Sequence, residues 1–381
     1  MLFRISSILT LLMASGCAFT AFHGPVPDIS RNELLSGEAI FGHRIDTSGI
    51  ADPGLLDVDD DMRAFVDEHV DARRADRDRM RRLLSSMIET GLMSLDYSDT
   101  ATKTASRTFH DRVGNCISFT SLFVALGREA GLDVTFQTVE VPPMWHTDSD
   151  LVILNDHVNA LVKQSFESRV VVDFNVAEMK GNYPAIEVSD EYALALYFNN
   201  VAMDALRAGN DEKAFRLLKR SIETHDKIAA NWANLGVIYS RNGANDYAIR
   251  AYAAALELDK NHRQSLTNLA ALYRSEGRED VANRYSRRIK RYQQQNPYYH
   301  YYSALSAYDS NDFGEALKRL EHALRLKSTD DKFYNLQGLI YEQLGDPDMA
   351  LHSFTRARDL AVFSDARTAY SNKIAELSNE N

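Results

Sequence analysis

Cysteine is almost absent from this chain of 381 residues, which contains only Cys17 and Cys116. Two cysteines so far apart cannot form the paired Cys-x-x-Cys spacing of a zinc site, so the sequence predicts no zinc. The chain also lacks a basic tail and a basic excess, since its formal net charge is -11. An acidic balance favours solubility and argues against a general nucleic-acid-binding protein.

An apolar run opens the chain, but it is too short to cross a membrane as a mature helix. Residues 1–17 read MLFRISSILTLLMASGC, in which a basic start, an apolar stretch and small residues follow one another. This order is typical of an export signal. The small residues end on Cys17, which resembles the lipobox of bacterial lipoproteins. The resemblance implies cleavage after residue 16 and a lipid anchor on Cys17. Ala18, rather than Asp, implies the periplasmic face of the outer membrane. A plain secretory signal with an incidental cysteine is the alternative.

The remaining length, with 45% apolar residues, allows two or three domains with a hydrophobic core. Residues 17–56 contain several prolines and glycines and are interpreted as a loosely ordered tether. From residue 57 the pattern becomes helical, and it begins with Asp57, Asp59, Asp60 and Asp61. Acids at a helix start are stabilised by the helix dipole. The calcium-loop alternative lacks the glycine and the terminal Glu that such a loop needs.

Cys116 lies in the stretch GNCISFTSLF, where a Gly-Asn pair precedes an apolar run. Asn115 can cap a helix that begins at Cys116 and ends near Ala130, before Gly131. Its residues are apolar nearly all round, which predicts a buried helix. A thiol in the first helical turn can have its pKa lowered to about 3.5–7.5. If Cys17 carries lipid, Cys116 has no cysteine partner. An unpaired cysteine in an exported protein suggests a reactive thiol, and a buried inert thiol is the alternative.

Three β-strands are expected after this helix, in an α+β domain over residues 57–190. The segments 132–141, 151–163 and 169–175 are rich in β-branched residues, and the first alternates between apolar and polar positions. If the last two form a hairpin about residues 165–166, His157 and Asp173 fall nearly opposite. A nucleophile, a base and an orienting acid would then lie together. His110 and His146 are alternative bases.

The order of these residues resembles the transglutaminase-like superfamily, within the papain-like fold. The resemblance covers about residues 95–180 and rests on GNC, REAGLDV, DHVNALV and VVVDFN. It implies that Cys116 is the nucleophile, His157 the general base and then acid, and Asp173 the orienting acid. It also implies thioester formation from an amide, without a cofactor. Many relatives carry an aromatic residue where this chain has Asn159. The backbone N–H of Cys116 is one expected oxyanion donor, and candidates for the second are Asn115, Trp145 and Asn155.

The second half of the chain repeats every 34 residues, a period that returns an alanine five times: Ala214, Ala248, Ala282, Ala316 and Ala350. This period resembles the tetratricopeptide repeat. It implies an all-α solenoid over 195–378, with five repeats to residue 362 and a capping helix at 365–378. Such arrays dock peptides or proteins. In the stretch PYYHYY, Tyr298 and Tyr301 are candidates for the docking groove, or else they pack between helices. A basic patch on the third repeat, formed by Arg284, Arg287, Arg288, Lys290 and Arg291, could meet an acidic partner or be a solvated face.

The resulting hypothesis is a lipid-anchored envelope protein with a Cys-His-Asp acyl-transfer site. This site would hydrolyse peptide or isopeptide bonds in a protein recruited by the repeats. One alternative is a non-catalytic scaffold or assembly lipoprotein that binds partners through the repeats. Another is a transglutaminase that uses an amine acceptor in place of water.

Overall fold

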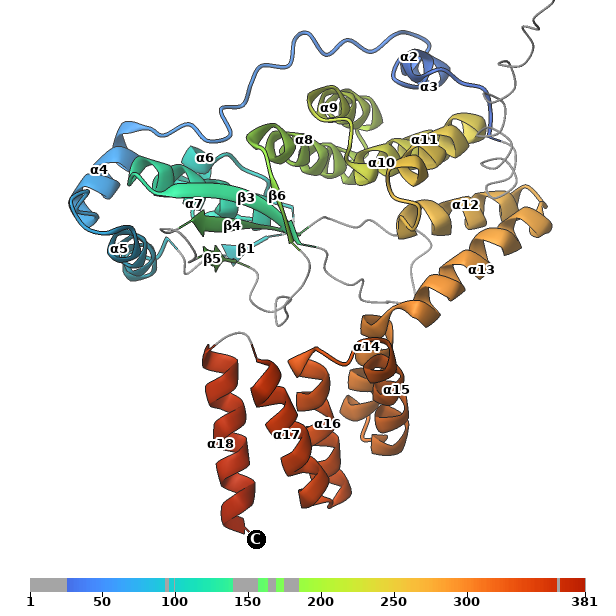
Figure 1. Ribbon diagram of the computed structural model, residues 1–381. Coiled ribbons are helices and arrows are strands. Elements are labelled where there is room, and N and C mark those ends of the chain that lie inside the picture. Colours follow the sequence, from blue (N-terminus) through green and yellow to red (C-terminus); the bar gives the residue numbers. More distant parts are fainter. Residues whose placement is uncertain are drawn as a thin grey trace, which may run out of the picture. The chain divides into compact units, whose positions relative to one another are not determined.

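The structure is a computed structural model that describes residues 26–92, 96–98, 100–139, 157–163, 169–174, 185–361 and 364–380. The described chain divides into two compact units, one ending at Arg287 and the other beginning at Arg288. Figure 1 shows helices and a small sheet in the first unit and helices alone in the second. Cys17 and the export signal lie outside the described residues, and so do Trp145, His146 and Asn155.

In the described part of the first unit, six helices and six strands precede the repeats. The helices are α2 (Arg31–Leu34), α3 (Glu38–Phe41), α4 (Asp60–His69), α5 (Asp76–Glu89), α6 (Ala105–Asp111) and α7 (Cys116–Glu129). The strands are β1 (Asp96–Tyr97), β2 (Val113–Gly114), β3 (Asp133–Val139), β4 (His157–Lys163), β5 (Arg169–Val172) and β6 (Ala185–Val188). The main sheet has the order β5-β4-β3-β6, with antiparallel neighbours throughout. The strands predicted from the sequence correspond to β3, β4 and β5, and β6 is a further strand of the same sheet.

Helix α7 lies at the centre of the core of this α+β region. Its side chains from Cys116 to Gly127 are all buried. Buried residues of α4, α5, β3, β4 and the first turns of the following repeats join them in one hydrophobic cluster. A helix that is apolar all round can be stable only inside such a core. The predicted burial of this helix and its predicted start at Cys116 are confirmed.

Residues 26–50 pack against the repeats of the same unit and are called the N-terminal strap here. The Arg31 guanidinium lies 2.7 Å from Asp226 Oδ2. The buried Tyr239 hydroxyl donates to the Leu34 carbonyl at 2.6 Å. The rings of Phe41 and Phe215 meet edge to face. A loosely ordered tether therefore does not describe residues 26–50, because these contacts with distant residues hold the segment in place.

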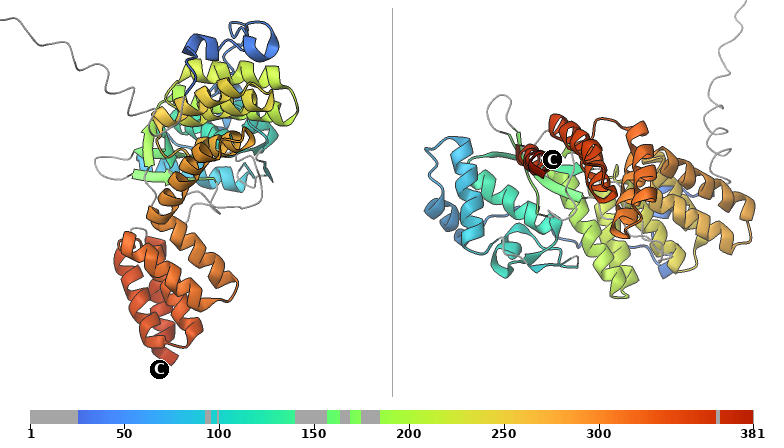
Figure 2. Two further views of the ribbon diagram at one scale, coloured as in Figure 1. Left: turned by 90° about the vertical axis from the view of Figure 1, so that its right-hand side faces the viewer. Right: turned by 90° about the horizontal axis from the view of Figure 1, so that it is seen from below.

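The repeats form five helical hairpins followed by one more helix. They are α8 (Asp190–Arg207) with α9 (Asp211–Thr224), α10 (Ala229–Arg241) with α11 (Asn245–Leu258), α12 (Arg263–Ser275) with α13 (Glu279–Gln295), α14 (Pro297–Asp309) with α15 (Phe313–Leu326), α16 (Asp331–Leu344) with α17 (Pro347–Leu360), and α18 (Ser364–Glu380). The alanines that define the repeat are all fully buried. Figure 2 shows from two further sides how the helices of the second unit pack side by side.

Each hairpin turns at a residue with a left-handed backbone. These residues are Gly209, Gly243, Gly277, Asn311 and Gly345, with φ between 60° and 78°. Glycine reaches this region without steric cost, and asparagine tolerates it better than most residues. The five hairpins follow one another at the predicted spacing, although the first helix begins at Asp190 rather than at residue 195 and the last one ends at Glu380 rather than at residue 378.

Candidate functional site

Cys116 is the first residue of α7 and is 9% exposed. Asn115 precedes it as the N-cap, and its side-chain oxygen accepts from the Ser118 N–H at 3.2 Å. The thiol therefore lies in the first turn of a buried helix, where the helix dipole favours a thiolate. This is the local setting that the sequence predicted for a reactive cysteine.

Asn115 does more than cap the helix. Its amide nitrogen donates to the Thr102 hydroxyl at 2.8 Å. The Ser118 hydroxyl donates to the Asn115 oxygen at 2.9 Å and accepts from the Lys103 N–H at 2.8 Å. These bonds fasten the segment before α6 to the start of α7. The structure thus gives Asn115 a structural role, and its contacts do not support it as the second oxyanion donor.

The start of α7 lies against the start of β4. Thr120, one helical turn after Cys116, donates from its hydroxyl to the Val158 carbonyl at 3.1 Å. Val158 directly follows His157, the first residue of β4. The His157 side chain lies outside what the structure describes. The backbone arrangement nevertheless brings the cysteine-bearing helix turn and the His157 strand start together.

Asp173 lies beside the same region, but its strand register differs from the prediction. Ala160 pairs with Val172, so Asp173 continues this ladder opposite Asn159 rather than opposite His157. The Asn159 amide nitrogen donates to Asp173 Oδ2 at 3.0 Å. The hairpin is centred on residue 166, within the predicted range of 165–166. With this centre the residue opposite Asp173 is Asn159, two positions after His157, so His157 is a diagonal neighbour of Asp173. Diagonal neighbours on paired strands lie about 7–8 Å apart, within reach of long side chains.

Aromatic contacts tie the Asp173 segment to α7. Phe174 lies with its ring centroid 6.1 Å from those of both Phe119 and Phe123. Helix α7 therefore touches both of the segments on which the sequence placed its base and its acid. Of the three predicted catalytic residues, the structure places Cys116 and Asp173 fully and His157 by its backbone alone.

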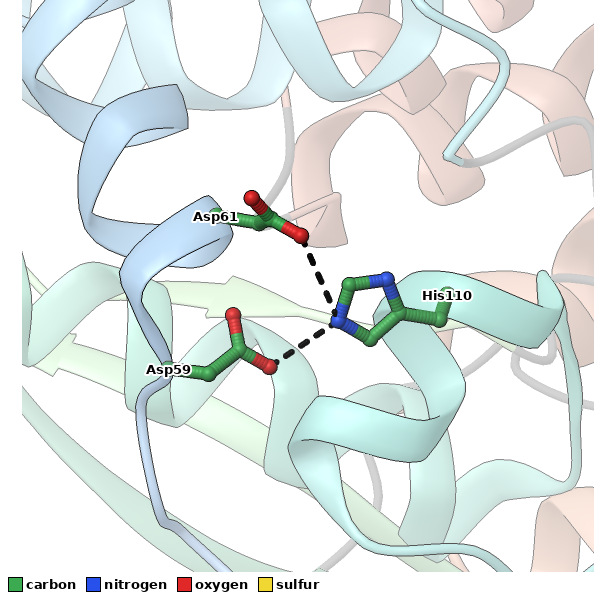
Figure 3. Close-up of side chains that lie close together, drawn as sticks. All are labelled: Asp59, Asp61 and His110. Atoms are coloured by element: carbon green, nitrogen blue, oxygen red, sulfur yellow. Dashed lines mark hydrogen bonds and ion pairs between the residues drawn. The ribbon is translucent and has the colours of Figure 1, made fainter.

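His110, one of the alternative bases, lies on α6 beside the start of α4 (Figure 3). Its Nε2 is 3.0 Å from Asp59 Oδ2 and 4.0 Å from Asp61 Oδ2. Asp59 is the N-cap of α4 and accepts from the Met62 N–H at 3.0 Å. Partial burial raises the pKa of Asp59, but hydrogen bonds from Ser106, Met62 and His110 outweigh it and lower the pKa. The prediction that these acids serve a helix start is confirmed for Asp59.

Asp59, Asp61 and His110 are also the described group whose ligand atoms lie close enough for one metal ion, within 4.8 Å of one another. The Asp61 and His110 side chains are 79% and 45% exposed. Asp59 is already committed to capping and to Ser106. The arrangement is therefore explained by the helix cap and its histidine neighbour.

The first helices of the early repeats carry buried amides that the sequence analysis did not single out. Gln264 donates to Asn234 at 2.9 Å, and Asn234 donates to Asn199 at 2.9 Å. All three are buried, so the amides join α8, α10 and α12 to one another. The repeat period signals only one of the three, since Asn234 belongs to a series of asparagines at positions 200, 234 and 268, whereas Asn199 and Gln264 lie outside that series.

Tyr298 and Tyr301 pack between helices, which is the second of their two predicted roles. The Tyr298 hydroxyl donates to Asp330 Oδ2 at 2.9 Å. The Tyr301 ring stacks on Phe333 with centroids 5.0 Å apart. Both rings join the hydrophobic cluster of α14 to α16. The basic patch on α13 is largely exposed, and within it Arg284 pairs with Asp280 at 2.9 Å.

Comparison with known proteins supports the repeats. The tetratricopeptide repeat family matches residues 229–262 and 331–361, which are two of the five hairpins. No curated protein matches the chain. The chain thus contains tetratricopeptide repeats in an all-helical solenoid region. A transglutaminase-like fold for residues 57–190 stays a prediction.

Several solved structures are similar to part of this chain. MamA 41-end from Desulfovibrio magneticus RS-1 is 18% identical, with 45% of this chain and 96% of that chain covered and a TM-score of 0.25. YrrB, a TPR protein with an unusual peptide-binding site, is 14% identical, with 47% and 92% covered and a TM-score of 0.25. The APC/C hetero-tetramer Cut9–Hcn1 is 20% identical, with 49% and 36% covered and a TM-score of 0.25. These TM-scores are too low to support an argument.

Among the described residues, no helix combines the length and the apolar character needed to cross a lipid bilayer.

Proposed function

We propose that this chain is a protein-interaction scaffold that binds a peptide or protein segment through the repeats of its second unit. The family match over residues 331–361 supports a repeat of the docking type there. The observation that carries the proposal is the difference in exposure between the first helices of the repeats. In α10, every residue from Ala230 to Tyr239 is buried. In α14, only Ala304 is buried.

The second unit therefore keeps partly exposed side chains on the helices that line the groove in such repeats. Tyr302 and Leu305 on α14 are half-buried, and so are Asn335 and Leu339 on α16. Positions spaced by three or four residues share one helix face. This mixture of an aromatic ring, aliphatic side chains and an amide is typical of surfaces that bind peptides.

The test is a peptide selected from a displayed random library against the full chain, with its affinity measured by fluorescence anisotropy. In the double variant Tyr302→Ala/Asn335→Ala, we expect at least ten-fold weaker binding, equivalent to about 1.4 kcal/mol. The matched control is Glu321→Ala/His352→Ala, which truncates exposed residues on the second helices α15 and α17. Equal affinities for all three proteins, or a library that yields no binding peptide, would contradict the proposal.

A second candidate function is acyl transfer by Cys116, with His157 and Asp173. The specific observation that favours it is the hydrogen bond from Thr120 to Val158, which holds the first turns of α7 against the strand that begins at His157. In the proposed reaction the Cys116 sulfur attacks an amide carbon, and the C–N bond breaks as a thioester forms. His157 takes the thiol proton and gives it to the leaving amine. Water then cleaves the thioester, or an amine does so in a transglutaminase.

This candidate is tested by trapping the thioester. The full chain is incubated with cell-envelope extract, quenched in acid and digested, and adducts on the Cys116 peptide are identified by mass spectrometry. An acyl adduct in the wild type that is absent from Asp173→Ala supports the reaction. A labelled primary amine that appears in the product distinguishes cross-linking from hydrolysis. No adduct on Cys116 under conditions where the protein is folded contradicts the candidate.

Attachment to the cell envelope through lipid on Cys17 is part of the same proposal. It rests on the sequence at the start of the chain alone. Metabolic labelling with an alkyne-bearing fatty acid is expected to label the wild-type chain and not Cys17→Ser. Labelling of both proteins, or of neither, would contradict a lipid anchor at this residue.

A further inference from the structure

Asn159 is a polar residue in an apolar place. It lies in the middle of β4 and is 0% exposed, and its neighbours Val158 and Ala160 are buried as well. Burying an amide without a full set of hydrogen bonds costs about 1–3 kcal/mol. An aliphatic side chain at this position would avoid that cost. The presence of asparagine therefore calls for a role beyond core packing.

The amide is held by one end. Its nitrogen donates to Asp173 Oδ2 at 3.0 Å. Because an ionised carboxylate only accepts hydrogen bonds, this contact fixes which end of the amide faces Asp173. The Asn159 oxygen has no hydrogen-bond partner within the described part of the chain. The bond to Asp173 is thus what orients the side chain.

The place of this bond in the sheet connects it with the cysteine site. Strand β4 begins at His157, and antiparallel β5 ends just before Asp173, so both positions lie at the same end of the sheet. Positions 157 and 159 belong to one face of the strand because strand positions alternate between faces. A donor at residue 159 therefore restrains the carboxylate of Asp173 next to the strand start that carries His157.

We infer that Asn159 is a positioning residue, which holds the Asp173 carboxylate in place for His157 and thereby supports the thiolate of Cys116. The inference rests on the proposed acyl-transfer function. A hydrogen bond to the ionised form of a carboxyl favours that form. An ionised, oriented carboxylate stabilises an imidazolium, and the imidazolium stabilises a thiolate. Asn159 thus supplies a donor at the position where many transglutaminase-like proteins carry an aromatic residue.

The experiment measures how fast iodoacetamide alkylates Cys116 as a function of pH in the full chain. Peptide mass spectrometry reads Cys116 separately from Cys17. In Asn159→Leu, we expect the midpoint of the rate profile to rise by about one pH unit, because the restrained carboxylate loses its donor. Asp173→Asn is expected to raise the midpoint at least as far. Asn159→Ala gives a second measurement if leucine is not accommodated in the core.

The matched control is Gln137→Leu. Gln137 is buried on β3 directly opposite Asn159, so this variant removes a neighbouring buried amide. We expect its midpoint to equal that of the wild type. Among the described residues, the charged groups fastened near the start of α7 include Lys103, which pairs with Asp111 at 2.9 Å, and Asp204, which accepts from Thr102 at 3.4 Å, and they stay unchanged in every variant.

The outcomes separate the inference from the function on which it rests. If the alkylation midpoint rises in Asp173→Asn but stays unchanged in both Asn159 variants, the positioning role of Asn159 is wrong and the proposed acyl-transfer site is retained. An unchanged midpoint in Asp173→Asn overturns the acyl-transfer site itself. A purely structural role for Asn159 would lower the melting temperature in the Asn159 variants and leave the alkylation midpoint where it is.

Discussion

At the scale of single residues, the repeats depend on small side chains where two helices cross. A Cβ atom built on Gly236 would lie 2.5 Å from the Tyr252 ring, and one on Gly338 would lie 2.7 Å from the Phe354 ring. Both rings are almost fully buried. These glycines therefore let an aromatic side chain of the second helix pack against the backbone of the first.

Gly236→Ala is predicted to destabilise the protein. The added methyl group meets a ring that cannot move away, and overpacking of this kind typically costs about 1–3 kcal/mol. The better helix propensity of alanine offsets about 1 kcal/mol of that loss. We expect urea unfolding, followed by circular dichroism, to show a lower midpoint than in the wild type.

Gly314→Ala is the matched control, because the nearest atom to its added methyl group would be 3.9 Å away. Its stability is expected to be equal to that of the wild type or up to about 1 kcal/mol higher. If both variants behave alike, helix crossing does not explain the glycine at residue 236.

At the scale of elements, the N-terminus of α12 contains a histidine whose protonated form is disfavoured by its surroundings. His262 is the N-cap of α12 and lies 3.0 Å from the Ser265 hydroxyl through Nδ1. Burial lowers the pKa of His262, although the nearby Asp259 carboxylate opposes this effect. A positive charge at a helix N-terminus is also disfavoured by the helix dipole.

This arrangement predicts a dependence of stability on pH. The folded state binds a proton on His262 more weakly than the unfolded state does. Protonation of His262 therefore does not reduce the free energy of unfolding above the unfolded pKa of about 6.5, and it reduces this free energy progressively as the pH falls below that value. For one group the slope is at most about 1.4 kcal/mol per pH unit. Urea unfolding between pH 7.5 and 5.5 should show this loss in the wild type and a smaller loss in His262→Gln.

His352→Gln serves as the control, since His352 is an exposed histidine on α17. The stability of the His352→Gln variant should depend on pH in the same way as that of the wild type. A slope in His262→Gln as steep as in the wild type would show that other groups determine the acid sensitivity in this range.

At the scale of the whole molecule, the two units differ in how deeply their helices are buried. Helices α7 and α10 of the first unit are buried over most of their length. In the second unit, α15 buries only Ala316, Leu320 and Ala323. Repeat arrays unfold locally, because each repeat is stabilised mainly by its neighbours. The second unit should therefore be the less stable of the two.

Hydrogen exchange measured by mass spectrometry under increasing urea tests this prediction. We expect peptides from α14 to α18 to lose protection at lower urea than peptides from α7 and α10. The difference arises because fewer buried apolar side chains must be exposed to open the second unit. Loss of protection at one common urea concentration throughout the chain would contradict it.

Local features of both regions could be predicted because they follow from spacing along the chain. The start of α7 at Cys116 follows from an Asn cap before an apolar run, and the repeated helical hairpins follow from alanine at a fixed period. These signals act within a few residues, so the chain encodes them locally. The backbone setting of the candidate site was predictable to the same extent: Cys116 lies at a helix start, His157 begins β4, and Asp173 directly follows the neighbouring strand β5.

Partners across the fold could not be predicted in the same way. A one-residue change in hairpin centre alters every opposite pair by two, so the partner of Asp173 depended on a register that alternation alone does not fix. The docking of residues 26–50 rests on contacts such as Tyr239 with Leu34, which lie far apart in sequence.

By itself, then, the sequence determined the local patterns of this protein: the buried helix that begins at Cys116, the strands β3 to β5 and the spacing of the repeats. Only the tertiary structure decided which buried polar groups meet. Asn159 became the donor to Asp173, and Tyr298 and Tyr301 became packing residues. The physical reason is that helix and strand patterns depend on neighbours along the chain, whereas a hydrogen bond between strands depends on register and on everything packed behind it.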